Sequence, residues 1–171
     1  CITSISQGMA SARRIFRIFC EKPEIVDGEN VKDVETLRGE VELKNLTFAY
    51  PDADKTNVLK NISVHVPAGS SLAVMGRTGS GKTTLANLML RLYDCEDGAI
   101  LLDGMPIREI PLQVLRQNIA YVPQDNFLFS DTIENNIAFG VEGLPFSAIE
   151  QAARDACIHD NIMDTIHQIQ Y

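Results

Sequence analysis

The sequence predicts an α/β fold built around one glycine-rich loop that joins a strand to a helix. The loop is the stretch Gly-Arg-Thr-Gly-Ser-Gly-Lys-Thr at residues 76–83, and a short apolar run at 72–75 comes directly before it. Apolar residues recur every three or four positions after the loop, which is typical of an amphipathic helix. Apolar and polar residues alternate at 41–50 and 58–66, which is typical of antiparallel strands. Strand, loop and helix in this order are the context in which Gly-x-x-x-x-Gly-Lys-Thr binds phosphate groups.

Each residue type in the loop answers a requirement of polyphosphate binding. Gly76, Gly79 and Gly81 allow backbone conformations that are closed to residues with a β-carbon. Successive N–H groups can then surround an anion, and the helix that is expected to begin near Lys82 adds its unpaired N–H groups and dipole. The Lys82 ammonium would reach the β- and γ-phosphates, and the Thr83 hydroxyl would bind Mg²⁺.

The competing interpretation of the motif is a glycine-rich turn that carries an exposed lysine. A chance match is expected in roughly one chain of this length in two hundred, given a glycine frequency of about 7%. The strand before the loop and the helix after it reduce that chance further. We therefore interpret 76–84 as a phosphate-binding loop.

Composition limits the class of partner. The chain has 171 residues and a net charge of −8, which argues against a nucleic-acid-binding surface. Residues 1–20 carry three arginines and no acid, which fits either a segment near an anionic membrane face or the solvated face of an ordinary helix. The four scattered cysteines have no metal-binding spacing and fit reduced thiols.

The first 39 residues are expected to form a helix and a linker. Apolar residues at three- and four-residue spacing predict a helix over 2–19, either the end of a membrane helix or an amphipathic helix packed on the domain. The acidic stretch 21–39, with Pro23, Gly28 and Gly39, is expected to be a linker. A domain boundary is therefore placed near residue 38.

The next elements follow from periodicity and turn residues. The alternation over 41–50 slips once, which predicts a bulge in that strand. The helix after the loop should bury the stripe Leu85, Leu88, Met89 and Leu92. Residues 99–102 and 105–107 should pair as a hairpin around Asp103-Gly104. Asp103 could instead be a metal-binding carboxylate at a strand end, but turn chemistry favours the hairpin.

The rest of the chain is predicted to contain one strand and three helices or helical turns. Pro111 should open a short helix to Gln117, and 119–122 should be a buried strand. Ser130 or Asp131 should cap a short helix through Ile137. Ser147 and Glu150 should form a capping box for a helix that buries Ile149, Ala152, Ala153 and Ala156.

Three separated features together resemble a known family. Tyr50 lies 26 residues before Gly76, and Gln124, in Tyr-Val-Pro-Gln, lies 42 residues after Lys82. The stretch 129–140 and the arginine-rich stretch 13–25 also match one pattern. The chain resembles the nucleotide-binding domain of ATP-binding cassette (ABC) transporters, of the exporter type with a fused membrane domain.

The resemblance implies a phosphate-loop (P-loop) NTPase-type sheet with an antiparallel β subdomain and an N-terminal helix. It implies that 1–20 end a membrane-domain helix, that 21–38 are a linker, and that 39–171 are the N-terminal part of the nucleotide-binding domain. On this resemblance, we expect the chain to be truncated before the signature motif Leu-Ser-Gly-Gly-Gln and the Walker B strand. The catalytic glutamate and switch histidine of the family are also absent from the sequence.

The resemblance also implies a role for each matched residue. Tyr50 would stack on adenine, and Gln124 would approach Mg²⁺ and the γ-phosphate. Thr84 would contact the α-phosphate, and Ser80 would add a donor. Lys82 and Gln124 would be the catalytic residues, and Thr83 and Gln124 the metal ligands. The residues implied to bind the nucleotide are Tyr50, Gly76, Arg77, Thr78, Gly79, Ser80, Gly81, Lys82, Thr83 and Thr84.

The implied cofactors are ATP and Mg²⁺, and the implied activity is ATP hydrolysis coupled to export. A second nucleotide-binding domain and a transmembrane domain, contacted through 126–136, would be the partners at the cytoplasmic face of the membrane. The chain alone is expected to be inactive, since it lacks the carboxylates that hydrolysis needs. The alternatives are another phosphate-loop NTPase, or a truncated chain that binds no nucleotide. A guanine-reading Asn-Lys-x-Asp motif is absent from the sequence.

Overall fold

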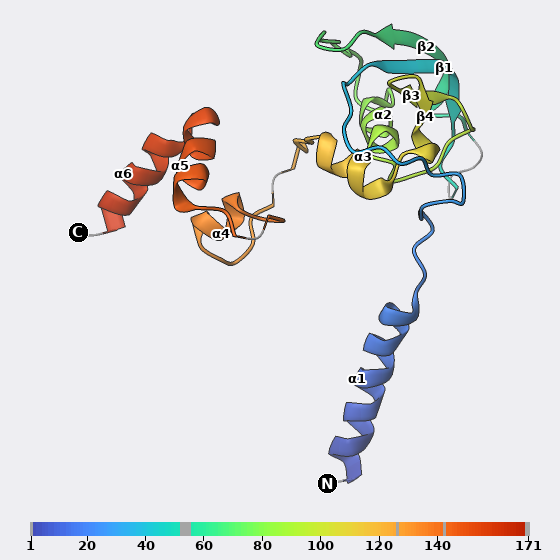
Figure 1. The fold of residues 1–171 in the computed structure, drawn as a ribbon. Helices are drawn as coiled ribbons and strands as arrows, with labels where there is room; N and C mark the ends of the chain where they lie inside the picture. The colour runs from blue at the N-terminus through green and yellow to red at the C-terminus, as the bar shows by residue number, and fades with distance from the viewer. Residues whose placement is uncertain (1, 52–55, 126, 142, 170–171) are drawn as a thin grey trace. The chain divides into compact units, whose positions relative to one another are not determined.

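The computed structural model describes residues 2–51, 56–125, 127–141 and 143–169. These residues divide into two compact units, Cys1–Ala120 and Tyr121–Tyr171, and each unit is described by itself. The first contains a sheet and the phosphate-binding motif, and the second is helical (Figure 1).

The first helix, α1, spans Ile2–Cys20, which confirms the helix predicted over 2–19. Arg17 lies in its last turn, where a positive charge interacts favourably with the helix dipole. Phe16 and Phe19 are 67% and 82% exposed, so these apolar side chains lack cover within the described structure. Among the described residues, no helix is long and apolar enough to cross a membrane. Residues 21–40 follow without a helix or strand, as the linker prediction requires. The predicted domain limits remain predictions.

The sheet is antiparallel throughout and has the strand order β2-β1-β3-β4. Its strands are β1 (Val41–Phe48), β2 (Leu59–Val66), β3 (Ile100–Leu102) and β4 (Met105–Pro106). The register between β1 and β2 shifts between Leu43 and Leu46 and again before Phe48, which confirms the predicted bulge. Asn45 has a φ of 49° at this irregularity.

The hairpin between β3 and β4 confirms the turn interpretation of Asp103. Leu102 pairs with Met105, so Asp103 and Gly104 alone form the loop. Their φ angles are 52° and 79°, and two positive values are typical of a type I′ turn. The Asp103 carboxylate accepts hydrogen bonds from the N–H groups of Arg38 (2.6 Å) and Glu40 (3.0 Å). The side chain therefore fixes the backbone that enters β1.

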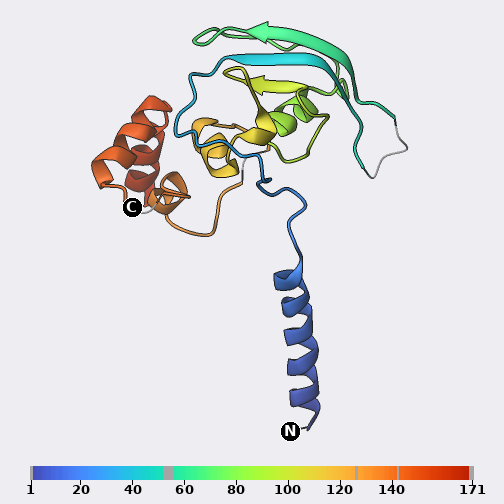
Figure 2. The ribbon, with the colours of Figure 1, turned by 45° about the vertical axis from the view of Figure 1, so that its right-hand side comes forward.

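Two helices pack against the sheet on the same side (Figure 2). They are α2 (Lys82–Met89) and α3 (Leu112–Asn118), with a 3₁₀ turn, η1 (Ile107–Glu109), before α3. The largest fully buried side chains of this unit are Leu46, Leu88, Ile100, Ile110 and Leu115. Helix α3 begins and ends one residue later than predicted, so Pro111 is its N-cap rather than its first residue.

The predicted stripe on α2 is only partly correct. Leu88 is buried, and Leu85 and Met89 are partly buried against the core. Leu92 is 47% exposed, because α2 ends at Met89 and the chain turns before Leu92 can continue the helical face.

Two predicted strands are wrong. Residues 72–75 and 119–122 have no strand conformation. Met75 and Val122 are 91% and 85% exposed rather than buried. A strand exists through ladder hydrogen bonds to a neighbour, and within the described part of the chain no strand pairs with either segment. The antiparallel sheet and helices are thus present, while the strands expected before the loop and before Gln124 are absent from the described residues.

The second unit contains α4 (Ile133–Ile137), α5 (Phe146–Asp155) and α6 (His159–Ile169). The cap of α4 is Thr132, whose Oγ1 accepts the Asn135 N–H at 3.1 Å, so the predicted caps Ser130 and Asp131 are wrong. Asp131 instead accepts hydrogen bonds from the Asn135 side chain and the Thr132 N–H, which hold the pKa of its carboxyl below the ordinary value.

The predicted capping box at the start of α5 is also wrong. Pro145 is the N-cap and Ser147 lies inside the helix, because Pro145 provides the extended conformation that precedes a helix. Ile149 and Ala153 are buried as predicted, whereas Ala152 and Ala156 are exposed.

Candidate functional site

The glycine-rich loop turns directly into α2, whose first residue is Lys82 as expected. Gly79 and Gly81 have φ angles of 81° and 90°, in the region that favours glycine. A β-carbon on Gly81 would lie 2.7 Å from Leu59 Cδ2, and one on Gly76 would collide with the Ser80 hydroxyl. Position 81 therefore requires glycine for its positive φ and for lack of space, whereas the contact at Gly76 is with a serine side chain that can rotate.

The Lys82 ammonium bonds back onto the loop. Its Nζ donates to the carbonyl oxygens of Gly76 (2.8 Å) and Arg77 (3.0 Å) and to Ser80 Oγ (3.4 Å). The Ser80 N–H donates to the Arg77 carbonyl at 3.1 Å and closes the turn. The ammonium is exposed to solvent on this loop, so an anion could reach it directly.

The first turn of α2 offers further donors. The Leu85 N–H bonds to the Gly81 carbonyl, as the first bond of the helix ladder. The N–H groups of Lys82, Thr83 and Thr84 precede that bond and have no acceptor within the helix. Thr83 is exposed, which leaves its hydroxyl accessible, whereas Thr84 is buried.

Tyr50 is linked to the same helix turn. Its hydroxyl donates to Thr84 Oγ1 at 3.0 Å. Its ring makes edge-to-face contacts with Phe48 and Tyr93, with centroid separations of 5.1 and 5.0 Å. Sequence reasoning missed Tyr93 and the bond to Thr84. No local pattern marks this contact, because Tyr93 lies beyond the end of α2 and meets Tyr50 only in the folded chain.

The donor set fits a nucleotide triphosphate. Residues 76–84 contain Arg77 and Lys82 and no acidic side chain, and Gly81 has a positive φ and little space for a β-carbon. The described residues contain no group of three or more His, Cys, Asp or Glu side chains that could hold a metal ion. Mg²⁺ commonly takes few protein ligands and completes its shell with phosphate oxygens and water, and the role of the Thr83 hydroxyl as such a ligand remains a prediction.

Gln124 is an exposed loop residue of the second unit. Its approach to Mg²⁺ and the γ-phosphate therefore remains a prediction. The segment 127–136, predicted to contact a membrane domain, exposes Phe127 and Leu128 by 76% and 78%, and Asn126 lies outside the described residues.

A phosphate-loop nucleotide-binding protein is recognised by a glycine-rich loop that leads into a helix with a lysine at its start. The loop over 76–84 and the helix that starts at Lys82 place this chain in that class. The family model described as ABC transporter matches residues 59–170, and the chain belongs to that family.

Curated relatives agree with the family. The chain is 43% identical over 161 residues to the ATP-dependent lipid A-core flippase of Syntrophus aciditrophicus (strain SB), covering 94% of this chain and 26% of the relative. It is 43% identical over 157 residues to the protein of the same name from Escherichia coli (strain K12), covering 91% of this chain and 26% of the relative. The chain thus spans about a quarter of the length of these relatives.

A solved structure is similar in fold. The structure of a bacterial Atm1-family ABC exporter with ATP bound matches with a TM-score of 0.78 and 36% identity, covering 95% of this chain and 28% of that chain.

Proposed function

We propose that this chain forms the ATP-binding part of an ABC exporter, in which ATP binding and hydrolysis drive the export of a substrate across a membrane. One observation carries the proposal. The exposed Lys82 ammonium lies on the loop carbonyls at the first residue of α2, next to a helix N-terminus, which favours the binding of an anion.

In this proposal the loop residues Gly76 to Thr84 hold the phosphates and Tyr50 stacks on adenine. A flat aromatic face excludes water from a purine. Thr83 and Gln124 bind Mg²⁺, which neutralises phosphate charge when bound. Lys82 and Gln124 act in catalysis, with Lys82 as a point charge on the β- and γ-phosphates.

The proposed partners follow from the relatives, which are exporters and flippases by name. A second nucleotide-binding domain completes the site, and the segment 126–136 contacts a fused transmembrane domain at the cytoplasmic face of the membrane. Within this scheme residues 1–20 end a helix of that domain and residues 21–38 link it to the cassette.

The family match makes a kinase or GTPase the weaker candidate. Failure to bind nucleotide is the alternative that needs an experiment. Calorimetric titration of the full chain with Mg-ATP should show saturable binding. Lys82→Ala should weaken it at least about tenfold, since a charge-assisted bond to phosphate contributes about 1.5–3 kcal/mol. Lys60→Ala, an exposed lysine on β2, is the control and should bind normally. If Lys82→Ala and Lys60→Ala bind ATP equally, the assigned role of the loop is wrong.

A further inference from the structure

Residues 26–32, here called the strap, are bonded to the cassette although they have no helix or strand conformation. The Val26 carbonyl accepts a hydrogen bond from Arg91 Nη2 at 3.0 Å. Asp27 Oδ1 accepts the N–H of Leu112 at 2.9 Å. The Lys32 N–H donates to the Glu109 carbonyl at 2.8 Å, and the two side chains form an ion pair. The strap is therefore anchored at three separate places.

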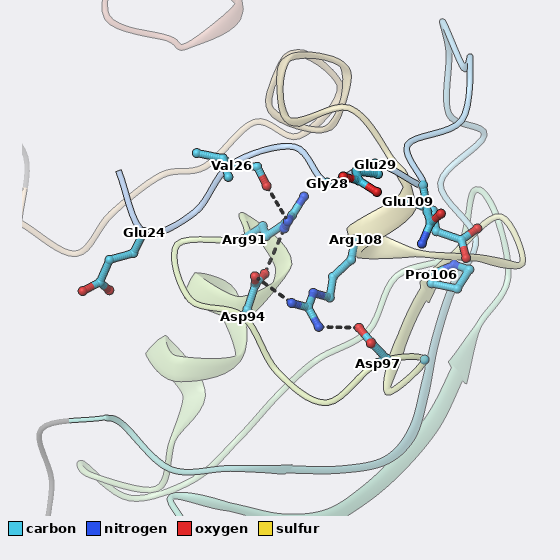
Figure 3. Close-up of a pocket in the computed structure, with 12 residues that line it drawn as sticks. Glu24, Val26, Gly28, Glu29, Arg91, Asp94, Asp97, Pro106, Arg108 and Glu109 are labelled. Atoms are coloured by element: carbon cyan, nitrogen blue, oxygen red, sulfur yellow. Dashed lines mark hydrogen bonds and ion pairs between the residues drawn. The ribbon is translucent and has the colours of Figure 1, made fainter. Parts of the chain in front are cut away.

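Arg91 is the centre of this contact (Figure 3). Its side chain is 3% exposed, and its Nε donates to Asp94 Oδ1 at 2.9 Å. Within the described residues its Nη1 has no hydrogen-bond partner, only the longer ion pair to Asp27 Oδ1 at 3.7 Å. A buried guanidinium is costly to leave incompletely bonded, so the strap carbonyl and carboxylate contribute directly to its stability.

The place of each anchor connects the strap to the nucleotide site. Arg91 lies two residues beyond Met89, the last residue of α2, and the first residue of that helix is Lys82 of the phosphate-binding loop. Eight residues of helix are about 12 Å long, so the strap lies at the far end of α2 from the loop. Leu112 is the first residue of α3, and α3 ends at Asn118, shortly before the segment that leads to Gln124.

Asp27 performs the function of a helix cap for α3. Pro111, the N-cap residue, offers no side-chain hydrogen bond, and the strap carboxylate takes the first N–H instead. A carboxylate at a helix N-terminus is also favoured by the helix dipole. Strap residues Val26 and Gly28 also line a cavity of about 480 Å³ together with Arg91, Asp94 and Arg108. The strap thus connects Arg91, just beyond α2, with the first residue of α3.

We propose that the strap is a coupling element, in which docking of residues 26–32 on Arg91, Glu109 and the start of α3 and the binding of ATP at residues 76–84 favour each other. The inference rests on the proposed function, since it needs ATP as the ligand of the loop. Asp27 is its positioning residue: it touches no part of the phosphate-binding loop and acts through Arg91 and Leu112. Because coupling between two sites is reciprocal, each partner must change the affinity of the other by the same factor.

The test combines hydrogen exchange with ATP titration on the full chain. In the wild type, Mg-ATP should slow amide exchange at Lys32 and Leu112 about fivefold, the lower end of usual coupling. Asp27→Ala should abolish that slowing and raise the Kd for ATP about fivefold. Asp33→Ala is the matched control, because it removes an exposed carboxylate from the same linker and should behave like the wild type.

The outcomes separate the coupling from the function. If ATP binds the wild type but leaves both amides unchanged, or if Asp27→Ala binds ATP as Asp33→Ala does, the coupling is refuted and the proposed function stands. If the wild type binds no ATP, the proposed function fails and the coupling with it. If Asp27→Ala does not fold, Arg91→Lys provides the second test. It keeps the positive charge, and it should likewise abolish the slowing of exchange and raise the Kd for ATP.

Discussion

The hydroxyl of Tyr50 donates a hydrogen bond to Oγ1 of Thr84 across 34 residues of sequence, at a distance of 3.0 Å. This bond ties the residue proposed to stack on adenine to the helix turn proposed to hold the phosphates. Since Thr84 is 5% exposed and the Tyr50 ring rests on Phe48 and Tyr93, the ring has few alternative positions.

Substitutions at Tyr50 should separate stacking from positioning. Tyr50→Leu removes the ring and should raise the Kd for ATP about tenfold, since stacking of a base on an aromatic side chain contributes about 1–3 kcal/mol. Tyr50→Phe keeps the ring and should cost less than about threefold. Titration with inorganic tripolyphosphate, which has no base, should be unaffected by either change. A parallel loss of tripolyphosphate binding would contradict the stacking role.

Gly81→Ala should destabilise the first unit. The φ of 90° is strained for alanine, and the added methyl group would lie 2.7 Å from Leu59 Cδ2. We expect a loss of about 1–3 kcal/mol in the free energy of unfolding, measured by urea denaturation. Gly28→Ala is the control, because its β-carbon would meet nothing within 4 Å and its φ is not positive. Equal stability of the two variants would disprove the steric requirement.

Asp103 should make stability depend on pH at the acid end. Burial raises the pKa of this carboxyl, but the N–H groups of Glu40 and Arg38 outweigh burial and hold the pKa below its ordinary value of 3.8. The unfolded chain therefore takes up the proton first, so the contribution is complete above the ordinary pKa and is lost as pH falls through the lower folded value.

Asp103→Asn should remove this part of the acid dependence, measured as the urea midpoint between about pH 5 and pH 3. Asp131 titrates in the same direction, because hydrogen bonds from Asn135 and Thr132 lower its pKa. The Asp131→Asn variant is therefore measured in parallel, to show how much of the remaining acid dependence of stability comes from Asp131. An unchanged slope in Asp103→Asn would show that the turn carboxylate contributes nothing.

Asn136 should hold the loop before α4 in place. Its Oδ1 accepts the Phe129 N–H at 2.8 Å, and its Nδ2 donates to the carbonyl of Thr132 at 2.8 Å. Asn136→Ala should speed hydrogen exchange at the Phe129 amide at least about fivefold, because a hydrogen bond contributes about 1 kcal/mol. Asn161→Ala on α6 is the control. Exchange at Phe129 that stays slow in Asn136→Ala would contradict the assignment.

Local chemistry predicted the parts of the fold that local contacts determine. The Asp103-Gly104 turn, the bulge in β1 and the start of α2 at Lys82 each depend on a few neighbouring residues, and all three are confirmed. The predicted strands at 72–75 and 119–122 depend instead on distant partners. Their apolar character was correctly recognised, but burial requires neighbouring strands that the described residues do not provide.

The same distinction holds for the site. The loop glycines and Lys82 could be recognised from one contiguous motif, since their function depends on spacing along the chain. Arg91 and Tyr93 could not, because nothing in the local pattern marks a residue at the end of a helix as a partner of residues 26–27 or of Tyr50. The cap of α4 was predicted wrongly for a related reason. Ser130, Asp131 and Thr132 are all residue types that cap helices, and the backbone around them decides which one does so.

The three bonds of Lys82 have a consequence for how a ligand is captured. Because the ammonium already satisfies the carbonyls of Gly76 and Arg77, the loop keeps its curvature through interactions internal to the chain. In the proposed nucleotide complex, a phosphate would replace these carbonyls as the acceptor of Lys82 and would leave the two carbonyls to water. The rate of such binding should be limited by rotation of the Lys82 side chain rather than by ordering of the backbone.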